Sequence, residues 1–136
     1  MNIVIREYTN CSMKELLPLY ESVGWTNYTA RPETLENAYH HSLKVLAAYD
    51  KERLLGILRA VGDGYSIVFI QDILVFPAYQ RNGIGTALVQ ALLERYPDVY
   101  QIELATDCEP RTVGFYRSLG FIELSELGCT AFMRMK

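Results

Sequence analysis

The chain has few cysteines, no long apolar stretch and no strong excess of one charge. Its three cysteines (Cys11, Cys108 and Cys129) are scattered, which argues against a disulfide framework and against metal-ligand spacing. They indicate free thiols in a reducing compartment. No apolar run reaches the roughly 18 residues needed to cross a bilayer, and the first residues lack a secretory pattern. We therefore expect a cytoplasmic location, no membrane partner and no bound metal.

The charge balance and the length limit the classes of protein and partner that remain possible. A net charge of -3 gives no general reason to expect a nucleic-acid partner. There is no internal repeat, low-complexity segment or linker. At 136 residues with 50% hydrophobic content, the chain is long enough for one globular core. We expect a single domain over residues 1–136.

Apolar spacing and turn signals predict an α/β (α+β) fold with helices on both faces of a mixed, mostly antiparallel sheet of six or seven strands. A strand–helix–strand unit in the middle of the chain requires one parallel pair. Ser12 and Glu15 form a capping-box pattern at the start of the first expected helix. The expected helices cover 12–23, 32–41, 84–96 and 111–118, and the expected strands cover 3–8, 43–49, 53–61, 65–76, 99–106, 121–125 and 129–135.

The most informative stretch is 71–86, where an apolar strand stops at Pro77 and a Gly-x-Gly pair precedes a helix. The start of a helix has N–H groups without intrahelical partners and carries partial positive charge. The first turn contains no acidic residue, and Arg81 stands just before it, which suits an external anion such as a phosphate. A tight turn without a ligand remains an equal alternative on these grounds.

Two common phosphate-binding motifs are excluded at this turn. A P-loop needs Gly-Lys-Ser/Thr at the helix start, whereas Gly85 is followed by Thr86 and Ala87. A dinucleotide fingerprint needs a third small residue where this chain has Leu88.

The remaining pattern resembles that of the GNAT superfamily of N-acetyltransferases. Residues 80–85 (Gln-Arg-Asn-Gly-Ile-Gly) match the family's Gln/Arg-x-x-Gly-x-Gly/Ala motif. Upstream, residues 74–77 (Leu-Val-Phe-Pro) look like its strand ending V-x-P. Downstream, residues 115–121 look like its F-Y-x-x-x-G-F segment. The resemblance covers most of the chain and implies a GNAT-like fold.

The resemblance also implies acetyl-CoA as co-substrate. It would lie where the two parallel strands separate. The backbone of Ile73, Leu74 and Val75 would pair with the pantetheine amides. The family often has a cofactor-binding asparagine where this chain has Glu109, whose side chain can instead cap the helix that begins at Pro110. The residues expected to wrap the pyrophosphate are Arg81, Asn82, Gly83, Ile84, Gly85 and Thr86.

The implied chemistry is attack of an amine on a thioester. Tyr116 matches the family's general acid and would protonate the leaving thiolate; the alternative is a packed core tyrosine. Asp72 is a carboxylate in an apolar strand, where pleating places it on the same face as Ile70 and Leu74 unless a bulge intervenes. It is the candidate general base, against a purely structural role. Glu103 is a weaker candidate, and ordered water can also serve.

The acceptor site would involve the variable region that contains Trp25 and Tyr28, although these aromatic side chains can equally pack the helices onto the sheet. The favoured function is acetyl transfer to a primary amine of a small molecule. Acetylation of a protein lysine or N-terminus, and a non-catalytic acyl-CoA-binding module, are the alternatives. Dimers are common in the family, so a homodimer is also an expectation.

Overall fold

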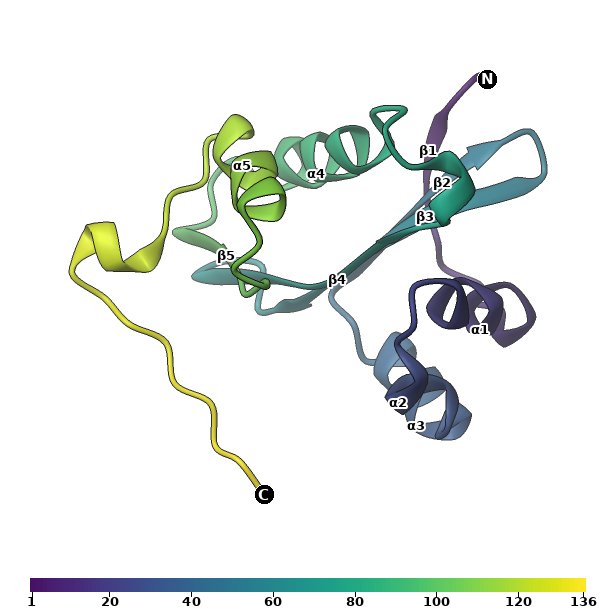
Figure 1. The fold of residues 1–136 in the computed structure, drawn as a ribbon, viewed down its shortest axis with the longest axis horizontal. Coiled ribbons are helices and arrows are strands. Elements are labelled where there is room, and N and C mark those ends of the chain that lie inside the picture. The colour runs from purple at the N-terminus through teal and green to yellow at the C-terminus, as the bar shows by residue number, and fades with distance from the viewer. The chain divides into compact units, whose positions relative to one another are not determined.

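Five strands form one sheet in the computed structural model, which describes residues 1–136 (Figure 1). The strand order is β1-β2-β3-β4-β5; the first three pairings are antiparallel and β4 pairs with β5 in parallel. The mixed sheet with one parallel pair is thus confirmed, with five strands rather than six or seven. The strands are β1 (Val4–Glu7), β2 (Lys44–Asp50), β3 (Arg53–Gly62), β4 (Ile67–Val75) and β5 (Gln101–Leu104).

The chain divides into two compact units, Met1–Ala105 and Thr106–Lys136, and a single domain stays a prediction. The first unit contains the sheet and four α-helices. Figure 1 shows α1–α3 on one face of the sheet and α4 on the other. None of the helices has the length and apolarity that a membrane crossing requires. The helices are α1 (Met13–Ser22), α2 (Thr26–Thr29), α3 (Pro32–His40) and α4 (Ile84–Arg95), with a 3-10 turn at Pro77–Tyr79.

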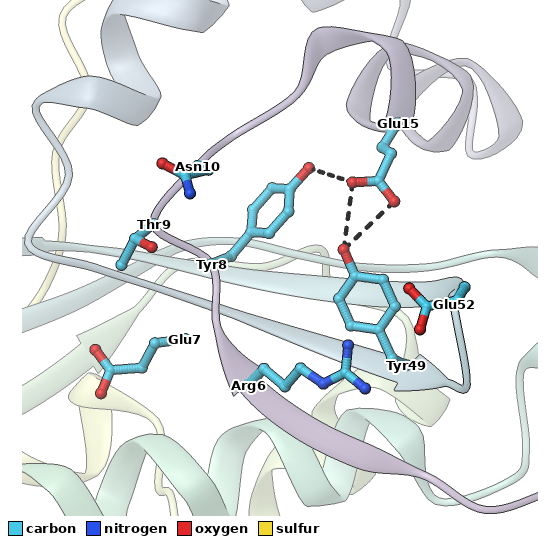
Figure 2. Close-up of a pocket in the computed structure, with 8 residues that line it drawn as sticks. All are labelled: Arg6, Glu7, Tyr8, Thr9, Asn10, Glu15, Tyr49 and Glu52. Atoms are coloured by element: carbon cyan, nitrogen blue, oxygen red, sulfur yellow. Dashed lines mark hydrogen bonds between the residues drawn. The ribbon is translucent and has the colours of Figure 1, made fainter.

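The start of α1 differs from the expected capping box. The Ser12 side chain makes no capping hydrogen bond, and the Ser12 N–H donates to the Tyr8 hydroxyl at 3.1 Å. The Glu15 carboxylate instead accepts from the hydroxyls of Tyr8 at 2.9 Å and Tyr49 at 3.2 Å, in an open polar hollow beside β1 (Figure 2). Glu15 therefore ties α1 to β1 and β2 rather than closing its own helix end.

Strand β4 contains a bulge that changes the direction of its side chains. Asp72 pairs with Arg59 and Ile70 pairs with Ala60, so Gln71 is the extra residue. Adjacent residues of β3 point to opposite faces, and the same must hold for their partners Asp72 and Ile70. The bulge that the sequence analysis allowed for is thus present, and Asp72 does not share a face with Ile70. Asp72 shares its face with Leu74, which packs in the core formed with α1 and α3.

The second unit contains α5 (Pro110–Ser118) and a 3-10 turn at Leu124–Leu127. The helix ends in a Schellman motif: the Phe121 N–H donates to the Tyr116 carbonyl, and the Gly120 N–H donates to the Arg117 carbonyl. The rings of Tyr116 and Phe121 lie 6.0 Å apart, which is the apolar contact that accompanies this motif. The spacing of the F-Y-x-x-x-G-F segment thus places its tyrosine, glycine and final phenylalanine where the Schellman motif that ends the helix needs them.

The two strands predicted at 121–125 and 129–135 are not formed. Residues 124–127 turn instead, and residues 130–136 make no backbone hydrogen bond within the chain. A strand needs a neighbouring strand for its backbone groups, and local sequence does not reveal whether one is available.

Gly120 offers a test of this helix end. Its φ is +94°, so Gly120→Ala forces a side chain into left-handed backbone and should lower the free energy of unfolding by about 1–2 kcal/mol. Gly114→Ala is the matched control, because Gly114 is inside the same helix and has open space around it. That control should be neutral or stabilise by up to about 1 kcal/mol in urea unfolding. Equal effects of the two substitutions would contradict this account.

Candidate functional site

The two parallel strands separate early, and one edge of β4 has no strand partner beyond Ile70. β5 pairs with β4 only along 67–70, whereas β4 continues to Val75. Along 71–75, β4 is bonded to β3 alone. This is the separation that the sequence predicted between its two parallel strands. An extended ligand can add to such an edge through main-chain hydrogen bonds.

The register shows which residues present backbone groups at that edge. The Phe76 N–H donates to the Leu55 carbonyl of β3 at 3.0 Å. Because backbone groups alternate along an antiparallel strand, Leu74 also bonds toward β3, while Ile73 and Val75 direct theirs to the free edge. The Val75 carbonyl already accepts from the Gln80 side chain at 3.2 Å. Ile73 and the Val75 N–H are therefore available to a ligand, and Leu74 is not.

The turn between β4 and α4 has an unusual backbone. Arg81 has φ +67° and Gly83 has φ +77°. A left-handed arginine is uncommon and costs free energy, which makes it a marker of a functional turn. The Asn82 side chain donates to the carbonyls of Tyr79 and Gln80, at 2.9 and 3.2 Å, and holds the turn together. Asn82 thus has a structural role here, whatever it contacts outside the chain.

The start of α4 directs unpaired donors outward. Gly83 is the N-cap and supplies no side chain, and the first turn holds no acidic residue. The N–H groups of residues 81–86 have no backbone acceptor within the chain. Ile84 is buried, whereas Arg81, Asn82 and Gly83 are exposed. The structure thus brings the predicted residues from Arg81 to Thr86 together as a set of N–H donors suited to an anion.

Asp72 lies at the centre of a buried polar network beneath α1 and α3. Its carboxylate accepts from the Arg59 Nε at 2.8 Å and from the Tyr20 hydroxyl at 2.8 Å. The Tyr28 hydroxyl approaches its other oxygen at 3.4 Å. The exposed fractions of Asp72 and Arg59 are 2% and 6%. The carboxylate is thus paired with a buried guanidinium, and its role as a general base stays a prediction.

Tyr20 and Tyr39 remain neutral at physiological pH. The hydroxyls of Tyr20 and Tyr39 share a 2.7 Å hydrogen bond. Burial, together with the negative charge of Asp72, raises the pKa of both phenols far above the ordinary value. The Arg59 guanidinium lies over the Tyr39 ring at 5.6 Å. The network therefore pairs the Arg59 guanidinium with the Asp72 carboxylate, and the phenols of Tyr20 and Tyr39 lie beside this pair.

Trp25 and Tyr28 lie beside this network. Tyr28 stacks on Trp25 with ring centroids 6.0 Å apart, and the Tyr20 ring is 5.1 Å from that of Tyr28. Trp25 remains 36% exposed, and the Tyr28 hydroxyl points toward Asp72. These aromatic side chains pack on one another and Trp25 keeps an exposed surface, so their role in acceptor binding stays a prediction.

Tyr116 and Glu109 belong to the second unit. Burial and the nearby Asp107 carboxylate raise the pKa of Tyr116 to about 12, and its hydroxyl makes no hydrogen bond within the chain. Glu109 is the N-cap residue of α5, but its side chain does not cap the helix. Its N–H donates instead to the Asp107 carboxylate at 2.9 Å. The capping alternative for the Glu109 side chain is therefore wrong.

The sequence did not predict Arg59 and Tyr20 as partners of Asp72, or Tyr39 as the partner of Tyr20. Arg59 is the one charged residue within an otherwise apolar run from Leu54 to Val61, which is the signal that a buried partner was needed. The pairing of Arg59 with Asp72 depends on the bulge at Gln71, and no local sequence pattern predicts that bulge.

Comparisons with known proteins agree with this geometry. The model of the Acetyltransferase (GNAT) family matches residues 10–121. GCN5-related N-acetyltransferase 1, chloroplastic, of Arabidopsis thaliana is 33% identical over 82% of this chain and 56% of its own length. Serotonin N-acetyltransferase 2, chloroplastic, of Oryza sativa subsp. japonica is 32% identical over 87% of the chain and 60% of its own length.

Among solved structures, a GNAT family acetyltransferase from Streptococcus pneumoniae TIGR4 is 42% identical, with a TM-score of 0.91 over 99% of this chain and 98% of that one. AAC(6')-Iy, solved with a CoA bisubstrate analogue, has a TM-score of 0.76 at 17% identity over 100% of this chain and 99% of that one, which shows a shared fold. The family match spans most of the chain and includes both the Gly-x-Gly turn and α5. The chain therefore belongs to the GNAT family of acetyltransferases.

Proposed function

We propose that this acetyltransferase moves the acetyl group of acetyl-CoA to a primary amine of a small molecule. The observation that carries the proposal is the turn before α4, where left-handed Arg81 and Gly83 precede a helix start with unpaired N–H donors. That set of donors suits a pyrophosphate, and the free edge at Ile73 and Val75 suits the amide-bearing pantetheine arm that follows it.

The proposed chemistry uses the Val75 N–H of β4, and the resemblance to the family supplies the role of Tyr116. The amine nitrogen attacks the thioester carbonyl carbon, and the carbonyl oxygen becomes an oxyanion that the Val75 N–H stabilises. The C–S bond then breaks, the thiolate takes a proton from the Tyr116 hydroxyl, and the amine proton passes to a base or to water. Asp72 is the candidate base, and its carboxylate accepts hydrogen bonds from Arg59 and Tyr20.

The acceptor would be an amine with an apolar or aromatic part. The exposed face of Trp25, with Tyr28 beside it, can stack on such a group and can also attract a cation through its π face. A rice relative is named serotonin N-acetyltransferase 2, and serotonin is an arylalkylamine. A peptide acceptor is the alternative: a soybean relative, 33% identical, is named a histone acetyltransferase.

Isothermal calorimetry with coenzyme A tests the turn. Gly83→Ala should raise the dissociation constant at least tenfold, because a Cβ would obstruct the approach of a phosphate to the backbone. Gly24→Ala is the matched control: Gly24 has φ +79° against +77° for Gly83, and open space surrounds both. The control carries the same backbone strain and should bind as the wild type does. A wild type without affinity for coenzyme A would overturn the proposal.

An acceptor panel with acetyl-CoA tests the substrate class, read by release of free thiol. Arylalkylamines should be acetylated faster than polyamines, amino acids and lysine peptides. Trp25→Ala should raise KM for an arylalkylamine by about tenfold with a smaller change in kcat, since stacking contributes about 1 kcal/mol or more. Tyr65→Phe, at a tyrosine that is 83% exposed, serves as the control. Preferential acetylation of peptides would favour the alternative acceptor.

A further inference from the structure

Arg53 and Tyr79 contact each other beside the turn that precedes α4, and neither has a part in the proposed acetyl transfer. Arg53 begins β3, and Tyr79 ends the 3-10 turn Pro77–Tyr79. The Arg53 Nη1 donates to the Tyr79 hydroxyl at 3.0 Å, and the guanidinium lies over the same ring, 5.7 Å from its centroid. Both residues belong to the first compact unit, as does the turn that they adjoin.

Tyr79 is bonded to the segments on both sides of it. Its N–H donates to the Phe76 carbonyl at 2.8 Å, and its own carbonyl accepts from the Asn82 side chain at 2.9 Å. Its ring packs edge-on against the ring of Phe76, which in turn packs on the core. A movement of Tyr79 would therefore displace the carbonyl that holds Asn82. Asn82 lies between the two left-handed residues, Arg81 and Gly83.

The left-handed backbone at Arg81 needs support from outside the turn, because such a conformation is unfavourable and persists only where its surroundings hold it. The Asn82 contacts lie within the turn and move with it. Two side-chain hydrogen bonds connect residues 77–83 to the sheet: Gln80 bonds to the Val75 carbonyl at 3.2 Å, and Arg53 bonds to Tyr79. Val75 ends the strand that leads into the turn. Arg53 is therefore the connection to a second strand, β3.

We propose that Arg53 is a positioning residue for the pyrophosphate of acetyl-CoA. It fixes Tyr79 and thereby keeps the N–H donors of residues 81–86 in the arrangement that suits an anion, without contacting the ligand itself. Donors that are ordered before binding give a higher affinity, because the free energy of ordering them is not taken from the binding free energy. The inference rests on the proposed function and adds a residue of β3 to the cofactor site.

Calorimetry with coenzyme A provides the first test. Arg53→Met should raise the dissociation constant about fivefold, the size expected when one hydrogen bond and one cation–π contact are lost. The urea midpoint of unfolding should remain that of the wild type, because Arg53 is exposed. Arg6→Met is the matched control: Arg6 also lies over a tyrosine ring, at 4.9 Å from the centroid of Tyr49, and it should bind as the wild type does.

A double-mutant cycle separates positioning from direct contact with the ligand. Tyr79→Phe removes the hydroxyl and keeps the ring. In this background Arg53→Met should weaken binding by no more than about twofold, because the hydrogen bond is already absent. The effect of Arg53→Met in the otherwise wild-type chain should persist with 3′-dephospho-coenzyme A. A full effect without the Tyr79 hydroxyl, or an effect that disappears with the dephosphorylated ligand, would mean direct contact and would overturn the positioning role.

Limited proteolysis tests the turn in the free protein. Trypsin cleaves after arginine, and Arg81 is exposed within the turn. Cleavage of a folded protein follows the population that is locally open. Arg53→Met should therefore speed cleavage after Arg81 about fivefold by mass spectrometry, whereas Arg6→Met should not change it. A wild type that did not bind coenzyme A would overturn the proposed function, whereas an unchanged cleavage rate in Arg53→Met would overturn the positioning role by itself.

Discussion

Tyr116→Phe should lower kcat for acetyl transfer by about 10²-fold while leaving the affinity for coenzyme A within about twofold. The phenol is the group proposed to protonate the departing thiolate, and phenylalanine keeps the ring contacts with Phe115 and Phe121 while removing the proton. No partner is left unsatisfied by the loss, because the hydroxyl makes no hydrogen bond within the chain. Stopped-flow detection of thiol release, with calorimetry for binding, measures both quantities.

The pH dependence of the rate of acetyl transfer gives a second test of Tyr116. The pKa of Tyr116 is raised to about 12, so the acid stays protonated throughout the range in which the enzyme can be assayed. The rate should rise with pH as the acceptor amine loses its proton and should show no fall from Tyr116 below about pH 11. Tyr100→Phe, at a residue that is 88% exposed, is the control. Unchanged turnover in Tyr116→Phe with every amine would remove the acid assignment.

Arg59→Met should lower the free energy of unfolding by about 3–5 kcal/mol. The substitution keeps an unbranched apolar side chain but leaves the Asp72 carboxylate buried without its cation, and Asp72 is only 2% exposed. The Tyr20 hydroxyl alone cannot replace the guanidinium. Urea unfolding monitored by circular dichroism measures the loss.

Two comparisons decide whether the buried charge is the cause. Arg59→Met combined with Asp72→Asn removes both charges and should recover the larger part of the loss. Lys44→Met breaks the exposed ion pair with Glu7, whose atoms are 2.6 Å apart, and should cost less than about 1 kcal/mol. If the single Arg59 variant lost no more than the Lys44 variant, the network around Asp72 would not be a main source of stability.

The turn at Gly83 could be predicted from the sequence because its determinants are local. The two glycines, the arginine and the lack of an acidic residue all fall within one helix turn. They can therefore be read from consecutive positions in the sequence. The first five strands and the Schellman ending at Gly120 were predictable for the same reason.

The surroundings of Asp72 could not be predicted in this way. Its partners come from α1, α2 and β3, and their meeting depends on the packing of these elements and on the bulge at Gln71. The two final strands were predicted from composition alone, although pairing depends on a neighbour that composition does not specify. The Asp72 network and the two final strands both depend on partners that are distant in the sequence, and local preferences do not reveal such partners.

Because of the bulge at Gln71, the buried side chains in the two halves of β4 point to opposite faces of the sheet. Before it, Val68 and Ile70 belong to the α4 side; after it, Asp72 and Leu74 turn toward the opposite layer, which carries the aromatic side chains. One surplus residue thus lets a single strand pack on α4 at one end and on the layer of α1–α3 at the other. Deletion of Gln71 would turn the side chains on one side of the bulge to the opposite face of the sheet. The bulge is therefore constrained by the packing on both faces.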